Sequence, residues 1–519
     1  MKSLHLFAIG LLAAIGLATA THAAPRIGQK LVAMDGGHSV PHLSSDISGD
    51  TVVVGVPELG YATVFEKRGK IWEKQAQIIP DGGLGRFGWC VSISGNAIIV
   101  GAPQLNGSGA AYVFHRSGNN WKQAVKLLYD GPVEGDGFGE HVAIDRSTAI
   151  VGVAGDDEAG RDSGSAYVYF REGNAWRQQA KLIPSDSARG DAFGASVFVL
   201  GNTAVIGSNG NTHNNVRFCG AAYVFTRRDG VWTEQAKLTA SDAGKADRFG
   251  TAVSMSEKTI LVGAPFRDTE AKVDAGAAYT FLFDGNTWKE QGKLFPKDAQ
   301  KGHKFGTGVA MTPNIALVGA PWDDDVEVGS GATYSFVRSD EVWQQKEKVV
   351  PHDVGEDYHF GFSVNVSENA AIVSAHNIPH GAPTWPHGQG VQAYVFSTTE
   401  DFGTPPFSVK PIGLKLTTFG QVKRTDLLQN FPNPFNPETW IPYRLAHDGD
   451  VRFTIYDTDG VLVRSMDLGH QAAGHYVNLS SAVYWDGRNQ GGEHVASGLY
   501  FYTMSTGDFK ATRRMLIQK

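Results

Sequence analysis

Charged and aromatic side chains that could bind a ligand gather in a few short segments of the 519-residue chain. One segment places Trp322 directly before Asp323, Asp324 and Asp325, so an aromatic ring stands beside three carboxylates. A group of this kind could stack on a sugar ring or hold a cation. Acidic residues are also common as the solvated part of a surface loop, so the pattern leaves both interpretations open.

Two further segments carry side chains with similar capabilities. The first combines a cation with carboxylates and consists of Arg267, Asp268, Glu270 and Asp274. The second is rich in histidine and consists of His376, His380, Trp385 and His387. Imidazoles can ligate a transition metal, but these histidines could also be incidental, so metal binding is left unknown.

The sequence contains no motif of a common enzyme class. It has no nucleophile elbow, HExxH segment, Walker loop or dinucleotide fingerprint. Asp156-Asp157 and Asp323 to Asp325 are the acidic groups that a hydrolase assembled from several repeats could use. We therefore expect a protein without enzyme activity, and an extracellular hydrolase of polysaccharides or esters is the alternative.

These segments belong to an internal repeat. Each copy opens with Phe-Gly, and the opening phenylalanines are Phe87, Phe138, Phe193, Phe249, Phe305 and Phe360. A degenerate seventh start lies at Pro41-His42, and successive starts are 46 to 56 residues apart. A period of this size is typical of a repeat architecture.

The copy that begins at Phe249 indicates how each repeat folds. Short apolar runs occur around Val253, at 260–262, at 276–281 and at 288–294, and they predict four strands. Each unit has two apolar faces that it can bury only against its neighbours. Radial stacking is the common arrangement of such units, so the sequence predicts an all-β fold with a seven-bladed β-propeller.

The two ends of the repeat array predict how the ring closes. The last copy has a third strand at 392–396 but lacks the Trp-x-x-Gln-x-Lys-Leu strand that ends the other copies. Residues 27–35 resemble the end of that missing strand. We therefore predict a propeller over residues 24–397 in which an N-terminal strand completes the last blade and leaves no open edge.

Aspartates and tryptophans recur with the repeat. An aspartate lies six to eight residues before each start, and the seven are Asp35, Asp81, Asp130, Asp186, Asp242, Asp298 and Asp353. They could form a ring of carboxylates, but seven equivalent positions favour a structural role in which each binds backbone amides of a turn. The tryptophans are Trp72, Trp121, Trp176, Trp232, Trp288 and Trp343. Their regular recurrence, like that of the phenylalanines, favours packing between blades over sugar binding.

The succession of Phe-Gly and Gly-Ala-Pro resembles the FG-GAP repeats of the integrin α-chain propeller, and more closely those of secreted bacterial proteins. The resemblance covers residues 27–397 and implies a seven-bladed propeller that binds a protein or glycan ligand. Integrin-type repeats often hold calcium in an Asp-x-Asp-x-Asp-Gly loop. The corresponding turns here, at 256–258 and 312–314, lack the clustered oxygen ligands that calcium requires, so we expect no cofactor.

The segment between the second and third strands differs in length from copy to copy. In an antiparallel meander this loop projects on the same face as the connection between blades, opposite the tight hairpin turns. Binding residues are usually placed on variable loops of a rigid scaffold. We therefore expect the candidate residues to share one face of the propeller.

The N-terminus indicates export. Residues 1–23 combine Lys2, an apolar run from Leu4 to Leu17 and small residues before Ala20 and Ala23, which is typical of a signal peptide. The apolar run is too short for a transmembrane segment, and no other stretch of the sequence approaches that length. A net charge of -7 with scattered lysines and arginines argues against a nucleic-acid partner.

The chain has two cysteines, Cys90 and Cys219. They fall at different points of non-neighbouring copies, whereas a disulfide requires Cα atoms within roughly 7 Å. We expect two unpaired thiols.

The C-terminal part follows a different pattern. Residues 398–425 contain Pro405, Pro406 and Pro411 and are typical of a linker of restricted flexibility. Residues 426–519 contain six or seven short alternating strands, which predict a small Ig-like β-sandwich.

Motifs in this part resemble the C-terminal domains called FlgD-like Ig or type IX secretion sorting domains. They are Asn-Phe-Pro-Asn-Pro-Phe-Asn-Pro at 430–437, Trp-Asp-Gly-Arg at 485–488 and Ser-Gly-Leu-Tyr at 497–500. The resemblance implies a sorting signal recognised by secretion machinery. A plain stalk or lid is the alternative, and the motifs do not decide whether the domain is cleaved after sorting.

Together these features predict an exported binding or adhesion-type protein, located outside the cell or on its outer surface rather than in the periplasm. A structural envelope component without a discrete ligand is a further alternative. The sequence names neither the ligand nor the oligomeric state.

Overall fold

The computed structural model describes residues 29–33, 44–69, 71–130, 134–269, 272–339, 342–351, 357–375, 392–398, 424–428, 430, 439–476 and 482–518. The chain divides into two compact units, residues 1–406 and 407–519.

The described part of the first unit contains seven four-stranded antiparallel sheets, which are numbered in chain order and whose neighbouring strands are hydrogen-bonded. Sheet 1 consists of β2 (Ser45–Ser48), β3 (Thr51–Val56), β4 (Tyr61–Arg68) and β5 (Ile71–Ile78). Sheet 2 consists of β6 (Val91–Ser94), β7 (Ala97–Ala102), β8 (Ala110–Ser117) and β9 (Asn120–Leu127), with the short 3-10 helix η1 (Leu105–Gly107) between β7 and β8. Sheet 3 consists of β10 (His141–Asp145), β11 (Thr148–Val153), β12 (Ser165–Glu172) and β13 (Ala175–Leu182).

Sheet 4 consists of β14 (Phe193–Leu200), β15 (Thr203–Ser208), β16 (Ala221–Arg228) and β17 (Val231–Leu238). Sheet 5 consists of β18 (Ala252–Ser256), β19 (Thr259–Ala264), β20 (Ala277–Phe283) and β21 (Trp288–Leu294). Sheet 6 consists of β22 (Val309–Met311), β23 (Ile315–Ala320), β24 (Ala332–Ser339) and β25 (Val342–Val349). Sheet 7 consists of β26 (Val364–Val366), β27 (Ala370–Ala375), β28 (Gln392–Ser397) and β1 (Gln29–Val32).

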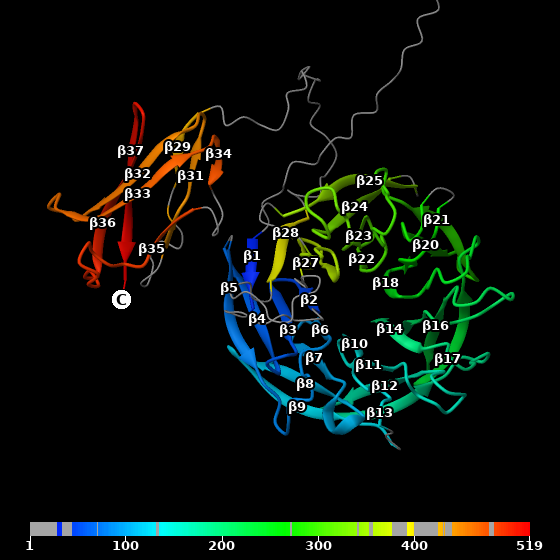
Figure 1. Cartoon of the computed structure of the whole chain (residues 1–519). Coiled ribbons are helices and arrows are strands. Elements are labelled where there is room, and N and C mark those ends of the chain that lie inside the picture. The colour runs from blue at the N-terminus through cyan, green and yellow to red at the C-terminus, as the bar shows by residue number, and fades with distance from the viewer. Residues whose placement is uncertain are drawn as a thin grey trace, which may run out of the picture. The chain divides into compact units, whose positions relative to one another are not determined.

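The sheets follow one another in chain order around a common centre, an arrangement consistent with a β-propeller (Figure 1). The second strand of each sheet is almost entirely buried because neighbouring sheets cover both of its faces. The fourth strands are mostly exposed or partly buried, and β5 and β13 each bury two of their eight residues. The predicted all-β architecture of repeated four-stranded units is therefore confirmed.

Glycines set the distance between neighbouring sheets. Gly263 of β19 lies so close to sheet 6 that a Cβ atom on it would be 2.0 Å from the carbonyl oxygen of Gly306. Gly306 is the glycine of a Phe-Gly pair, and its φ of 99° favours glycine. Equivalent close approaches of 1.8 to 2.2 Å occur at Gly55, Gly101, Gly152, Gly207 and Gly319. The two glycines of the repeat motif therefore face each other across each of these junctions.

Aromatic side chains fill the space beside these glycines. The six repeat phenylalanines are fully buried, and Phe249 packs edge-on against Tyr279 and Phe281 of its own sheet. The tryptophans contact the preceding sheet. For example, the Trp232 indole N–H donates a hydrogen bond of 2.8 Å to Gln179 of sheet 3. These contacts agree with the packing role that the sequence predicts.

β1 takes the place of the missing fourth strand, as the sequence predicts. It pairs antiparallel with β28, with Gln29 opposite Val395. The Gln29 side chain exchanges two hydrogen bonds of 2.7 Å with the backbone of Trp72 in sheet 1. Leu31 joins one apolar cluster with residues of sheets 1 and 7.

The second unit is also built of β-strands. One sheet has the order β33 (Leu462–Gln471), β32 (Gly449–Tyr456), β36 (Gly498–Thr506) and β37 (Phe509–Ile517). Short strands form the other sheets, namely β29 (Asp426–Leu427), β31 (Tyr443–Leu445) and β34 (Gly474–Tyr476), and β30 (Thr439–Ile441) with β35 (Val483–Trp485). One apolar core around Trp485, Tyr443 and Tyr502 joins these sheets, which is consistent with a β-sandwich.

The part of the chain that the structure describes holds no helix with the length and apolar character needed to cross a membrane.

We predict that Gly263→Ala lowers the free energy of unfolding of the first unit by about 3 kcal/mol, because the new methyl group collides with a backbone carbonyl of sheet 6. Gly292→Ala is the matched control, since it lies in the same sheet and its Cβ would meet only Thr280 Oγ1 at 3.6 Å. The control should stay within about 0.5 kcal/mol of the wild type. Urea unfolding followed by tryptophan fluorescence measures both, and equal stability of the two variants would show that the junction is not tight.

Candidate functional site

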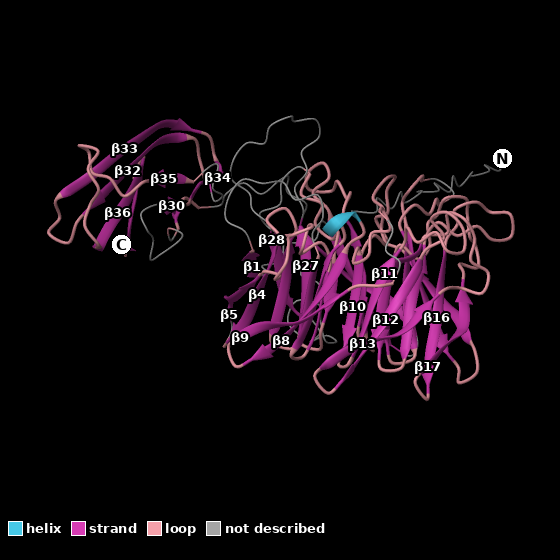
Figure 2. Cartoon of the chain, turned by 90° about the horizontal axis from the view of Figure 1, so that it is seen from below, coloured by secondary structure: helices cyan, strands magenta, loops and turns pink. Residues whose placement is uncertain are grey.

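The long loops of the first unit lie at one edge of the sheets and the tight hairpin turns at the other (Figure 2). We call the former the loop face. It contains the loops between second and third strands and the connections from each sheet to the next. Parallel bridges such as Gly276 to Phe305 join the end of such a loop to the next connection. The candidate residues that the structure describes belong to this face.

Asp323 is a buried structural group rather than an open one. Its carboxylate is 1 % exposed, accepts a hydrogen bond of 2.7 Å from the Tyr334 hydroxyl and forms an ion pair of 2.7 Å with Lys348 Nζ. The same ammonium lies 2.9 Å from Asp298 and 2.5 Å from Asp325. Three carboxylates therefore surround one lysine.

This grouping is held together electrostatically. Burial alone would raise the pKa of Asp323 above 3.8, but contact with His303, whose Nδ1 lies 3.3 Å away, and the charge of Lys348 lower it to about 2. Burial would lower the pKa of Lys348, but the aspartates raise it. Because the folded-state pKa of Asp323 is depressed, its stabilisation is present above about pH 4 and is lost as the pH falls through 2.

Oxygens of Asp298, Asp323 and Asp325 lie within 4.8 Å of one another, a spacing that could hold a metal ion. The Lys348 ammonium already bonds to all three carboxylates. The Lys348 ammonium therefore occupies the position of a cation among these three carboxylates.

The same arrangement recurs in neighbouring sheets. Asp186 accepts hydrogen bonds from the Tyr223 hydroxyl at 2.7 Å and from Lys237 Nζ at 2.6 Å. Asp242 bonds in the same way to Tyr279 and Lys293. The recurring aspartate thus ties a connection to the third and fourth strands of the sheet that follows it. The expectation that it serves turn amides is therefore incomplete, because side chains of the next sheet supply these bonds.

The other recurring aspartates differ. Asp81 and Asp130 lie in connections between sheets, where the Asp81 backbone N–H donates to Gln123 at 2.8 Å. Asp35 and Asp353 lie outside the described residues.

The remaining acidic candidates hold loops in shape. Asp268 accepts a hydrogen bond of 2.9 Å from the Asp274 backbone N–H, and Asp324 accepts one of 2.7 Å from Gly329. Arg267 forms ion pairs of 3.1 Å with Asp242 and 3.4 Å with Asp247. These bonds make the loops rigid, while any role in ligand binding stays a prediction.

Trp322 is partly exposed at the loop face. Lys304 Nζ lies 4.0 Å from the centre of its ring, and the His359 ring meets it edge-on at 5.3 Å. Glu270, His376, His380, Trp385 and His387 lie outside the described residues, so their predicted roles are untested.

Sequence reasoning missed Lys348, Tyr334, His303 and Lys304. A signal for the first two was present, because a Tyr and a Lys recur in the Gly-Ala-Ala-Tyr and Gln-x-Lys-Leu motifs at the same period as the aspartates.

Both cysteines are free, as predicted. Cys219 is buried, and its sulfur lies 2.8 Å from Nδ1 of His213. A fully buried thiol offers no access to a substrate.

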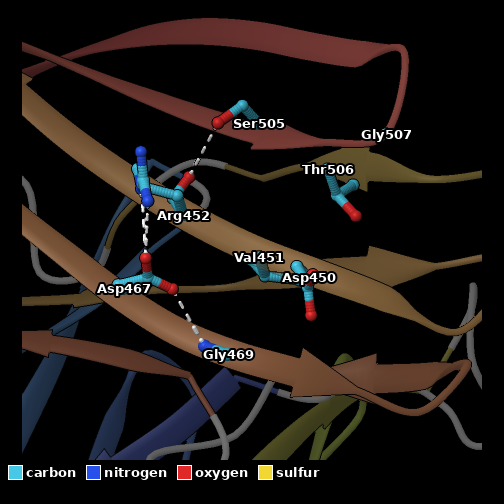
Figure 3. Close-up of a pocket in the computed structure, with 8 residues that line it drawn as sticks. All are labelled: Asp450, Val451, Arg452, Asp467, Gly469, Ser505, Thr506 and Gly507. Atoms are coloured by element: carbon cyan, nitrogen blue, oxygen red, sulfur yellow. Dashed lines mark hydrogen bonds and ion pairs between the residues drawn. The ribbon is translucent and has the colours of Figure 1, made fainter.

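A hollow on the second unit is lined by residues of β32, β33 and β36 (Figure 3). Arg452 and Asp467 form an ion pair of 2.7 Å across it, and Gly469 donates its N–H to Asp467 at 3.1 Å. Both charged side chains are more than half exposed, so the pair is a surface contact without a buried reactive group.

Comparison with known families agrees with this geometry. The family model described as FG-GAP repeat matches residues 72–114, 121–169, 176–225, 232–281, 288–336 and 343–396. Each match runs from the tryptophan in the fourth strand of one sheet through three strands of the next, so each contains one junction between sheets. The model described as FlgD Ig-like domain matches residues 441–508. No curated protein matches the chain.

We predict that Lys348→Met destabilises the first unit by roughly 3–5 kcal/mol at pH 7, because it leaves the buried Asp323 and its neighbours without a counter-charge. Lys289→Met is the control, since Lys289 pairs with Asp284 at 2.8 Å on an exposed surface and should hardly affect stability. Chemical unfolding of both variants tests this. A Lys348→Met protein as stable as the wild type would contradict the structural role of the lysine.

Proposed function

Because the chain belongs to the FG-GAP repeat family, we propose that it is a secreted or cell-surface binding protein whose loop face takes a protein or glycan ligand. FG-GAP repeats suggest an extracellular binding scaffold and fit extracellular proteins. The observation that carries the proposal is the contrast between the two edges of the sheets, with uniform hairpins at one and long loops of varied sequence at the other. Variable loops on a rigid framework are where binding sites are usually found.

The scaffold that we propose is a seven-bladed propeller closed by β1. The pairing of β1 with β28 supports this, as do the bonds from Gln29 to Trp72 of sheet 1. Ser45 of sheet 1 and Ser374 of sheet 7 share a hydrogen bond of 2.8 Å. A closed ring would hold the loops in fixed positions and leave no open edge for aggregation.

The rigidity of the loops supports recognition of a macromolecule. Asp268, Asp324 and Arg267 are engaged within the chain and hold their loops in one shape. A preorganised surface loses little conformational entropy on binding. Trp322 is the aromatic candidate among the described residues, and it is partly exposed.

The alternative of hydrolysis receives no support from these carboxylates. Asp323 is buried against Lys348, and Asp156 is buried against Lys181 at 2.7 Å. The FG-GAP propeller is typically a non-catalytic binding fold. We therefore propose binding without catalysis.

For the second unit we propose a role in secretion or anchoring. The match to the FlgD Ig-like domain supports an Ig-like module over residues 426–519, joined by a linker over 398–425 to the propeller at 24–397. A signal peptide over residues 1–23 would direct the chain to export, and secretion machinery would then recognise the C-terminal module.

We predict that the full chain reaches the cell surface or the medium of its native host, whereas a chain that ends at Thr425 stays in the periplasm. Fractionation combined with protease shaving of intact cells measures this. A periplasmic marker protein controls for lysis. If both chains remain in the periplasm, the C-terminal module is not a sorting signal, and if both reach the surface, it is not needed for sorting.

A further inference from the structure

Three cations on the loop face rest on aromatic rings. The Arg217 guanidinium lies 5.6 Å from the centre of the Phe218 ring. The Phe266 ring carries Arg248 at 5.6 Å and Lys304 at 5.0 Å, and Lys304 also lies over Trp322. These six residues, which we call the cation–aromatic arc, come from loops and connections of sheets 4, 5 and 6.

Direct contacts join the members of the arc from one sheet to the next. The Arg248 backbone N–H donates to the Phe218 carbonyl at 3.2 Å, which links the loop of sheet 4 to the connection that enters sheet 5. Lys304 then bridges the rings of Phe266 and Trp322, which belong to sheets 5 and 6.

The arc differs in its charge from three lysine–tyrosine contacts of this face. Lys181, Lys237 and Lys348 also lie over rings, at 5.2 to 5.4 Å from tyrosines. Each of them is neutralised by an aspartate within 3 Å. In contrast, Arg217, Arg248 and Lys304 form no ion pair among the described residues. Their rings fix the position of the cations without cancelling their charge.

The fold itself does not require these side chains. Arg248 and Lys304 directly precede Phe-Gly and have φ values of 53° and 50°. The equivalent positions in two other copies are occupied by Gly137 and Ala192, with φ values of 72° and 53°. A long cationic side chain is therefore not needed for this backbone, and a left-handed conformation disfavours it.

The aromatic members of the arc vary in the same way. Phe266 and Trp322 follow Gly-Ala-Pro, and the equivalent residues in sheets 3 and 4 are Gly155 and Gly210. Phe218 is 41 % exposed. These positions carry aromatic rings only in some copies, unlike the buried phenylalanines that pack every sheet.

The charge of Lys304 is only partly compensated. Lys304 is partly buried, and this burial lowers its pKa, an effect that the nearby Asp274 only partly offsets. A bound anion would supply the missing charge and stabilise the ammonium.

We propose that the cation–aromatic arc binds an acidic polysaccharide, with its carboxylate or sulfate groups on Arg217, Arg248 and Lys304 and its sugar faces against Phe218 and Trp322. An extended polymer with a negative charge on each sugar suits cations that are distributed over three sheets on an open face. This inference deepens the proposed function and depends on it for the claim that the loop face binds a macromolecule.

The test uses the full chain from Ala24 onward and a polyuronate as the probe. Isothermal titration at low and physiological salt should give saturable binding that weakens with salt. Arg248→Gln and Lys304→Gln should each raise Kd about tenfold, and the double variant should lose binding. Lys258→Gln is the matched control, because it removes an exposed cation from a hairpin turn at the opposite edge of sheet 5 and should leave Kd unchanged.

Three results would overturn the inference. They are a double variant that binds as tightly as the wild type, a control variant that weakens binding as much as Lys304→Gln does, and polyglutamate binding as tightly as the polyuronate, which would assign the arc to an acidic protein. Equal melting temperatures of all variants exclude misfolding as the cause of lost binding. If the chain is exported but binds no polyuronate, this inference fails and the proposed export stands. If the chain stays in the periplasm but binds the polyuronate, the proposed export fails and this inference stands.

Discussion

The structure depends on one steric constraint, the contact of two glycine backbones where each sheet meets the next. A side chain at Gly101 or Gly319 would lie 1.8 Å from the carbonyl oxygen of the facing Phe-Gly glycine. A Cβ atom does not fit at such distances. Any residue other than glycine at these positions would therefore displace one of the two sheets. The contact also places the repeat phenylalanine in the core and aligns the loops on a single face.

The last junction is built differently. Ser374 occupies the position that glycine holds in the second strands of the other sheets, and it bonds to Ser45 of sheet 1. The Asn365 side chain also donates to the Ser45 carbonyl at 2.5 Å. Side-chain hydrogen bonds therefore replace backbone contact at the point where the first and last sheets meet. β1 covers the same region through Gln29 and Leu31.

Much of the fold could be predicted from the sequence because its signals are local and repeated. The apolar runs around Val253, at 276–281 and at 288–294 all fall within one copy, and the Phe-Gly pair recurs at the start of each copy. The orphan strand at 27–35 could be matched to β28 because only one copy lacked its fourth strand. In the second unit the short strands β29 and β35 were not predicted, since two or three residues give no periodicity.

The site was less predictable, because its contacts join different copies. Lys348 lies 50 residues from Asp298 in the sequence. The two meet because the connection between sheets 5 and 6 packs against β25, the fourth strand of sheet 6. The carboxylate of Asp323 looks like a ligand-binding group in the sequence, yet its burial becomes visible only in three dimensions. The left-handed backbone of Arg248 and Lys304 and the placement of their side chains over aromatic rings likewise have no signal in a single sequence.

The measurement that tests closure of the ring most directly is thermal unfolding of a chain that begins at Met34 and so lacks β1. A chain that begins at Gly28 and keeps β1 is the control. Our account predicts that loss of β1 lowers the melting temperature of the first unit by about 5 °C or more, because Leu31 and the bonds of Gln29 are removed. Identical melting curves for the two chains would contradict a propeller closed by its N-terminal strand.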